Sequence, residues 1–300
     1  MKVAIMKRND NRMKSAKKAN QSQIGLIVYR FKKNKMAIAG LVILAIIAVL
    51  IIAAPLYANY DNGVLQNIPQ RFQPPGREHL FGTDSYGRDL FTRVVYGGRI
   101  SLFAGIGTVF LAMVLGCMLG GVAGYFGGRV DMVIMRFVDI FMAVPPLLLS
   151  LAVCTALGQG TFNMIIALMI ADVPGFARIL RSSVLTVRDR EFIEAARCCG
   201  TSHLRIIVKH ILPNCIGPLV VHATLKVGSA ILSIAALGFL GIGVSSPTPE
   251  WGTILSDNRQ YIRYYPYLGI IPGLAIGITV MCVNFFGDGL RDALDPKMKK

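Results

Sequence analysis

Four charged side chains stand inside long apolar stretches of this 300-residue chain. An ionised group in such a stretch needs a partner or water. Arg136 and Asp139 are three residues apart and so share one face of a helix. We expect these two to form a structural pair rather than to contact a substrate. Asp172 and Lys226 interrupt two other apolar stretches, so all four are candidate intramembrane polar or pathway residues.

The residue types that carry catalysis or metal binding form no recognisable pattern. The chain has no Ser/His/Asp arrangement, no HExxH and no GxxxxGK[ST] loop for nucleotide phosphates. It has no CxxC pair, and its histidines have no partner at metal-ligand spacing. The histidines are His79, His203, His210 and His222. We expect no catalytic residue, no metal site and no cofactor on this chain.

The stretch 189–214 has the sequence DREFIEAARCCGTSHLRIIVKHILPN. Its first half favours helix, and Gly200 stands where a left-handed terminating residue is expected. Thr201 or Ser202 can cap a second short helix, and Pro213 marks a stop or kink. The apolar stripe expected on that second helix consists of Leu204, Ile207, Val208 and Ile211. Composition alone would make this element a simple connection between two larger ones.

The composition indicates a membrane protein. Hydrophobic residues make up 54% of the chain, charged residues only 16%, and the mean hydropathy is +0.55. A soluble domain carries nearer 25% charged residues. The net charge of +16 lies between apolar blocks instead of lining one face, which argues against a nucleic-acid partner.

The apolar blocks have the length needed to cross a bilayer. About 20 apolar residues in a helix span the hydrocarbon core. We therefore predict an all-α integral membrane protein with six transmembrane helices. The predicted spans are 36–57, 100–126, 132–157, 162–179, 216–241 and 267–287.

Orientation follows from the lysines and arginines. An inside N-terminus places 23 of them on the cytoplasmic side and seven outside, which predicts cytoplasmic termini. Residues 1–35 then form a basic cytoplasmic tail, 288–300 a second tail, and 58–99 an extracytoplasmic segment. Within the latter, 84–96 has helical spacing and could lie at the membrane interface or pack on the outer mouth of the bundle.

Glycines recur at helical spacing in two predicted spans. Such ridges let helix backbones approach closely in lipid, and we expect packing within this chain rather than a subunit interface. The first ridge is Gly116, Gly120, Gly124 and Gly128, and the second is Gly269, Gly273 and Gly277.

The stretch 189–214 resembles the EAA loop of ABC importer permeases. That motif is EAA, three residues, Gly, nine residues, then Ile-x-Leu-Pro, and here a histidine replaces the isoleucine, as in the peptide and nickel branch. The matching residues are Glu194, Ala195, Ala196, Gly200, His210, Leu212 and Pro213. The resemblance extends over most of the chain, at 81–84, 87–89, 129–131, 145–146, 237–241, 247–252 and 287–296. The last of these is similar to the tail of the dipeptide-type permease.

The resemblance implies a type I ABC importer permease fold with a cytoplasmic EAA coupling helix and a five-helix core over 100–287. It also implies a second homologous permease, two ATP-binding subunits that hold ATP and Mg, and an extracytoplasmic substrate-binding protein. Glu194 would carry charge at the docking face, Ala195 and Ala196 would allow close approach, and Gly200 would set the angle between two short helices.

The implied function is import of di- or oligopeptides across a bacterial-type cytoplasmic membrane. Nickel or another small solute carried by the same machinery is the alternative within the family. A secondary transporter or channel is the alternative of another class, and it would predict inverted repeats and no docking loop. A membrane enzyme would need a catalytic constellation, which the sequence lacks.

Overall fold

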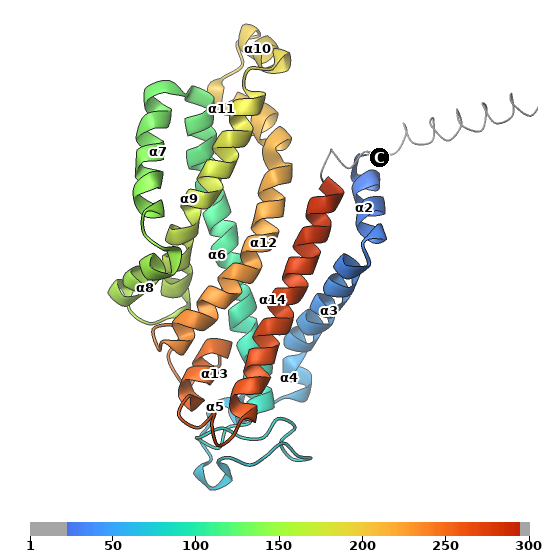
Figure 1. The fold of residues 1–300 in the computed structure, drawn as a ribbon, viewed down its shortest axis with the longest axis vertical. Helices are drawn as coiled ribbons and strands as arrows, with labels where there is room; N and C mark the ends of the chain where they lie inside the picture. The colour runs from blue at the N-terminus through green and yellow to red at the C-terminus, as the bar shows by residue number, and fades with distance from the viewer. Residues whose placement is uncertain (1–22, 295–300) are drawn as a thin grey trace, which may run out of the picture.

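The computed structural model describes residues 23–294, and every regular element in that range is a helix. Figure 1 shows a long bundle in which α10 lies at one extremity, while α5 and α13 lie toward the other. We call these the α10 end and the α13 end. The elements are α2 (Gln23–Lys33), α3 (Lys35–Ile52), α4 (Ala54–Tyr57), α5 (Tyr60–Val64), η1 (Ile68–Gln70), α6 (Leu90–Phe126), α7 (Gly128–Met142), α8 (Pro146–Leu157), α9 (Thr161–Val187), α10 (Glu191–Cys198), α11 (His203–Ile206), the π-helical turn η2 (Ile207–Ile211), α12 (Leu212–Phe239), α13 (Trp251–Asn258) and α14 (Tyr267–Leu294).

Five helical segments are long and apolar enough to cross a membrane: α3, α6, α9, the run from α11 to α12, and α14. A sixth crossing is reached only if α7 and α8 count as one span, and these two helices meet at 86°. The predicted span 132–157 is thus divided into two helices, and it counts as a crossing only if this bent pair forms a single span. Pro145 and Pro146 explain the bend, because proline removes a backbone donor and disfavours helix in the residue before it.

The helix predicted to begin at residue 100 begins at Leu90. Residues 90–99 are its first turns, and most of them are buried at the α13 end. Asp89 caps it, since its carboxylate accepts a hydrogen bond from the Thr92 amide at 2.8 Å. From Leu90 onward, the segment 84–96 packs on the bundle at its α13 end, as the second of the two predicted placements requires.

The first glycine ridge packs within the chain at Gly116, Gly120 and Gly124, as predicted, whereas a Cβ on Gly128 would meet nothing within 4 Å among the described residues. A Cβ on Gly120 would lie 2.2 Å from the Ala177 carbonyl oxygen of α9, and one on Gly116 would lie 2.4 Å from the Phe176 Cβ. Only glycine lets α6 and α9 approach this closely. The second ridge differs, because Cβ atoms on Gly273 and Gly277 would meet nothing within 4 Å among the described residues. The prediction of packing within the chain is wrong for these two.

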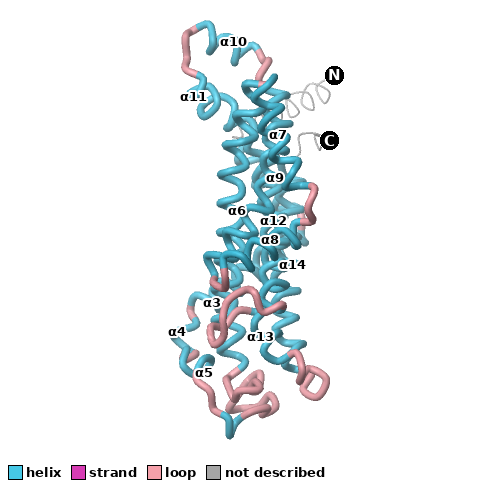
Figure 2. Tube along the Cα trace, turned by 90° about the vertical axis from the view of Figure 1, so that its left-hand side faces the viewer, coloured by secondary structure: helices cyan, strands magenta, loops and turns pink. Residues whose placement is uncertain are grey.

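The first predicted span lies beside the last one. Helices α3 and α14 run side by side, and Figure 2 shows the bundle from its side with loops concentrated at the two ends. A Cβ on Gly40 would lie 2.8 Å from the Cys282 carbonyl oxygen. Helix α2 packs on α14 through an edge-on contact between Phe31 and Phe286, whose ring centroids are 5.6 Å apart.

Candidate functional sites

The stretch 189–214 forms two helices joined by a tight turn at the α10 end. Helix α10 ends at Cys198, and Gly200 has φ of +71°, the left-handed conformation predicted for it. The Thr201 amide donates to the Ala196 carbonyl at 3.1 Å, which closes the turn. Ser202 occupies the N-cap position of α11, although its side chain makes no capping hydrogen bond.

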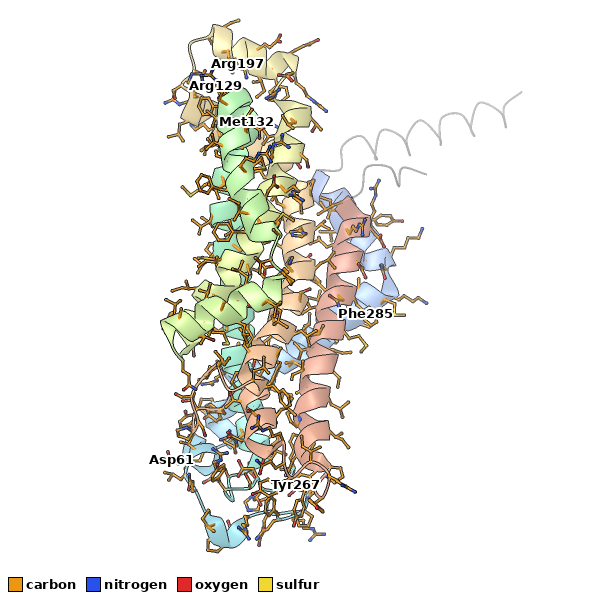
Figure 3. All side chains as sticks on the ribbon, turned by 60° about the vertical axis from the view of Figure 1, so that its left-hand side comes forward. Asp61, Arg129, Met132, Arg197, Tyr267 and Phe285 are labelled. Carbon is orange, nitrogen blue, oxygen red and sulfur yellow. The ribbon has the colours of Figure 1, made fainter. Side chains whose placement is uncertain are left out.

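One buried side chain and one aromatic ring anchor this turn to the bundle. Ile193 is fully buried and packs in the same apolar cluster as Val184 and Ile206. The Tyr125 hydroxyl lies 2.8 Å from the His203 Nδ1, and the Arg197 guanidinium lies 5.2 Å above the Tyr125 ring. Figure 3 shows Arg197 close to Arg129 at this end, far from Asp61 and Tyr267 at the other.

The outer surface of α10 and α11 is exposed and partly apolar. Glu194 and Ala195 are exposed, whereas Ala196 is half-buried and packs against the core. Leu204 of α11 is 73% exposed and Val208 of η2 is 51% exposed. The predicted apolar stripe therefore divides, because Ile207 and Ile211 are buried while Leu204 and Val208 face outward.

The second helix of the stretch continues into the fifth predicted span without a break. Pro213 lies in the first turn of α12, directly after the π-helical turn Ile207–Ile211. Proline has no amide to donate, and the wider turn accommodates it without ending the helix. The Asn214 side-chain amide donates to the His210 carbonyl at 2.6 Å. Of the stop or kink predicted at Pro213, the stop does not occur, because residues 203–239 form one helical run that contains Leu212.

The two charges predicted to need partners in the fourth and fifth spans pair with each other. The Lys226 Nζ of α12 lies 2.6 Å from the Asp172 Oδ1 of α9. The Lys226 side chain remains 28% exposed and that of Asp172 11% exposed. The pair therefore lies at a surface of the bundle that is partly open.

The predicted pair between Arg136 and Asp139 does not form. Asp139 bonds instead to Arg178 of α9, at 2.8 Å, and Arg136 is exposed with no ion pair to any described residue. The neighbouring Asp131 accepts hydrogen bonds from two guanidinium nitrogens of Arg181, Nε and Nη2. Two ion pairs thus join α7 to α9, one through Arg178 near the end of the predicted span and one through Arg181 just beyond it.

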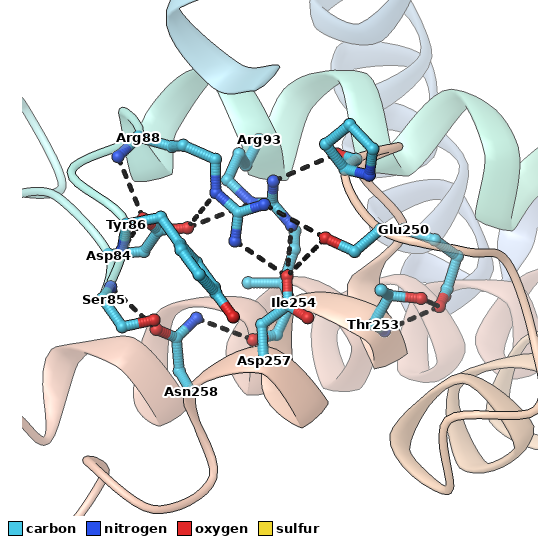
Figure 4. A network of polar contacts seen from close by, with 12 residues as sticks. Asp84, Ser85, Tyr86, Arg88, Arg93, Glu250, Thr253, Ile254, Asp257 and Asn258 are labelled. Atoms are coloured by element: carbon cyan, nitrogen blue, oxygen red, sulfur yellow. Dashed lines mark hydrogen bonds and ion pairs between the residues drawn. The ribbon is translucent and has the colours of Figure 1, made fainter. Parts of the chain in front are cut away.

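A network of buried charges at the α13 end was not predicted as a site. Figure 4 shows Arg88 and Arg93 around two carboxylates from distant parts of the chain. The Arg88 Nε lies 2.6 Å from Asp84, and the Arg88 Nη2 lies 2.8 Å from Asp257. The Arg93 Nη2 lies 3.1 Å from the same Asp257 oxygen. Two arginines and two aspartates balance in charge, so they can stay buried together.

Arg93 also donates to the chain on both sides of the network. Its Nη1 reaches the carbonyls of Gly63, at 3.0 Å, and Pro247, at 3.2 Å. Arg93 thereby connects the segment before α6 with the loop before α13. The sequence motifs at 81–84, 87–89 and 247–252 contained this signal, but not the pairing.

Glu250 is a second buried anion in this region. Its carboxylate caps α13 by accepting hydrogen bonds from the amides of Gly252 and Thr253, both at 2.9 Å, and it also accepts from the Ser101 hydroxyl at 3.0 Å. Burial raises the pKa of Glu250, and these hydrogen bonds act in the opposite direction. The adjacent Trp251 donates to the Val94 carbonyl at 2.8 Å, which fixes α13 to α6.

The histidines are dispersed over the bundle. Among residues 23–294, no three His, Cys, Asp or Glu side chains come together as a metal site would need. His79 bonds to Asp89 at 2.9 Å, and His203 bonds to Tyr125. The His222 ring packs edge-on against Phe176 with centroids 4.8 Å apart.

Two protein-family models match the chain. Residues 104–300, about two thirds of the chain, match the binding-protein-dependent transport system inner membrane component. Residues 22–75 match the N-terminal transmembrane domain of oligopeptide transport permease C.

Curated relatives match over nearly the whole length. A dipeptide transport system permease of Alkalihalophilus pseudofirmus is 48% identical over 270 residues, which cover 90% of this chain and 88% of the relative. An oligopeptide transport system permease of Bacillus subtilis is 41% identical over 271 residues, covering 90% and 88%. A glutathione transport system permease of Escherichia coli is 42% identical over 270 residues, covering 90% and 89%.

Solved structures support the same fold. An inward-facing structure of the MetNI methionine ABC transporter superposes with a TM-score of 0.55 at 21% identity, over 68% of this chain and 96% of that chain. These matches leave no place for the secondary-transporter, channel or enzyme alternatives. The chain therefore belongs to the multi-pass inner membrane components of binding-protein-dependent ABC transporters, in the branch of the peptide permeases.

Proposed function

We propose that this permease imports di- or oligopeptides, with its α10 end and both termini on the cytoplasmic side. Relatives named for dipeptides, oligopeptides and glutathione, each more than 40% identical, support a peptide substrate. The excess of lysine and arginine in the segments at the α10 end supports the orientation. Nothing in the described part of the chain favours nickel.

The proposed complex contains a second homologous permease, two ATP-binding subunits and an extracytoplasmic binding protein. The family description implies a binding protein and an ATPase as partners, and the finer stoichiometry is part of our proposal. ATP and Mg would bind on the partner subunits. The permeases would form the pathway through the lipid bilayer.

The observation that carries the proposal is the exposed surface of α10 and α11. Glu194, Ala195, Leu204 and Val208 project from an end of the molecule that is otherwise built from packed helices. Small and apolar side chains beside a carboxylate suit a groove on a partner protein. We assign this surface to docking of the ATP-binding subunit, together with the other motif residues Ala196, Gly200, His210, Leu212 and Pro213, of which Gly200 and Pro213 are also exposed.

The turn at Gly200 offers a direct test of coupling. Nothing lies within 4 Å of a Cβ built on Gly200, but φ of +71° strains any branched side chain. We expect Gly200→Val to leave membrane insertion intact while ATP hydrolysis no longer drives uptake in proteoliposomes that contain all subunits. Gly217→Val, at another open glycine outside the turn, is the control. Normal coupling in the Gly200 variant would refute this role of the segment.

Two native thiols test the orientation. Cys198 and Cys199 are exposed at the α10 end, whereas Cys154, Cys215 and Cys282 are buried. A membrane-impermeant maleimide should label Cys198 and Cys199 in inverted vesicles and leave them unlabelled in right-side-out vesicles. A Cys198→Ser, Cys199→Ser double variant measures the background from the remaining thiols. Labelling of the pair from the outside would reverse the proposed topology.

A further inference from the structure

A stripe of polar side chains follows one face of α12. His222, Lys226, Ser229 and Ser233 are spaced by four, three and four residues, so they lie above one another on the helix. The stripe extends over about 16 Å at 1.5 Å per residue. The rest of this 28-residue helix is predominantly apolar. We call these four residues the α12 stripe.

The α12 stripe is only partly covered by the rest of the described chain. Ser229 is exposed, Ser233 is half-buried and Lys226 retains 28% of its side-chain surface. The Nε2 of His222 is buried and finds no hydrogen-bond partner in the described residues. The stripe thus carries unused hydrogen-bonding capacity at its His222 end and open surface at its Ser229 end.

Lipid is not a suitable neighbour for such a face. A lysine near the middle of a spanning helix is expensive in hydrocarbon, and intramembrane charges face a bundle interior or a water-filled cavity. The Lys226–Asp172 ion pair lowers that cost but leaves both side chains partly accessible. The open side of the α12 stripe must therefore face water or a second subunit.

We propose that the α12 stripe lines the substrate pathway. When a peptide passes, Lys226 would leave Asp172 and bind the carboxylate terminus of the peptide, while Asp172 would bind its ammonium terminus. This inference rests on the proposed peptide function. In the resting bundle the lysine and the aspartate neutralise one another at 2.6 Å. A zwitterionic peptide supplies one group of each sign, so every charge stays paired when the partners exchange. His222 would donate or accept one further hydrogen bond to the peptide backbone.

Uptake of blocked peptides by the complete reconstituted transporter tests the exchange. The substrates are one tripeptide, its N-acetylated form and its C-amidated form. Lys226→Gln should reduce uptake of the free tripeptide about tenfold more than uptake of the C-amide, the size expected for one charge-assisted hydrogen bond. Asp172→Asn should discriminate in the same way between the free and the N-acetylated form. The binding protein is the same in every assay, so its own preference cancels when each variant is compared with wild type.

A purely structural pair predicts a different result. Both variants would then lose uptake of all three forms by the same factor, and the inference would be wrong while the peptide function stands. If wild type takes up none of the three forms, the proposed function itself fails. If Lys226→Gln does not assemble, the reversed pair with Asp172→Lys and Lys226→Asp keeps an ion pair. An unchanged substrate preference in that reversed pair would overturn the inference.

A matched control is available in the ion pair between α7 and α9. Asp131 of α7 pairs with Arg181 of α9, which lies nine residues from Asp172, without touching the α12 stripe. Asp131→Asn should leave the ratio between free and blocked peptides at its wild-type value. An equal shift in the control would assign the effect to general distortion of α9 and would also overturn the inference.

Discussion

The two ends of this permease are built in opposite ways. The α13 end is joined by side chains more than 150 residues apart, such as Arg93 with Asp257 and Trp251 with Val94, and its charges are buried. At the α10 end, helix α10 is held by its one buried side chain, Ile193, and by the Tyr125 contacts. Leu204 and Val208 remain exposed there. One end buries its charged side chains within the chain, whereas the other leaves apolar side chains exposed.

The difference has an energetic basis. Buried and mutually paired charges are costly to break one at a time, so the α13 end should unfold only as a unit. A short helix with one buried side chain opens at much lower free energy. Low local stability is expected where a segment has to adapt to a moving partner.

The largest expected effect lies in the charge network. Arg93→Ala leaves Asp84 and Asp257 with one arginine between them, and we expect a loss of about 3–5 kcal/mol. The single tryptophan, Trp251, lies in this region and reports unfolding by its fluorescence in detergent. Arg259→Ala, at an exposed position nearby, is the control and should change little. A stability loss below that of the α10-end variant described below would contradict the comparison.

An intermediate effect is expected in the trunk between the two ends. Gly120→Ala forces α6 away from the Ala177 carbonyl, and such overpacking typically costs about 1–3 kcal/mol. Gly277→Ala adds a methyl group where nothing lies within 4 Å, and it should be neutral or slightly stabilising in the isolated chain. Denaturant titration of the two variants measures the difference. Equal midpoints would show that α6 and α9 can separate freely.

The smallest expected effect lies at the α10 end. Tyr125→Phe removes the hydrogen bond to His203, a loss of about 1 kcal/mol. Amide hydrogen exchange in α10 should accelerate about fivefold, while the Trp251 unfolding transition stays in place. Met132→Leu, at an exposed position of α7, is the control. A shift of the tryptophan transition by the Tyr125 variant would mean that the two ends are not independent.

Much of this arrangement could be predicted from local sequence. Apolar length located most of the spanning segments, Gly200 identified the turn, and the EAA pattern led to the family that the comparisons confirm. These signals lie within single helices or within a few residues of a turn. The docking role of the α10 end and the pathway role of Lys226 remain predictions.

Pairing between distant residues could not be predicted in the same way. Asp139 pairs with Arg178 and not with Arg136, because α9 places Arg178 opposite α7. Helix α9 continues nine residues beyond Arg178. The segment with Arg88 and Arg93 was predicted either at the membrane interface or packed on the bundle, and only the pairing with Asp84 and Asp257 shows why both arginines are buried. Local hydropathy treats a paired arginine like a free one, so it placed the start of α6 ten residues too late.

The unbroken run from His203 to Phe239 has a mechanical consequence. A torque applied at His203 travels along hydrogen-bonded backbone to Lys226, over 23 residues or about 35 Å, with no loop to absorb it. Two places can bend this run: the wider turn at Ile207–Ile211, and Pro218, which has no amide hydrogen to donate within α12. The stiffness of the helix at these places would determine how much of a rotation imposed at His203 reaches Lys226.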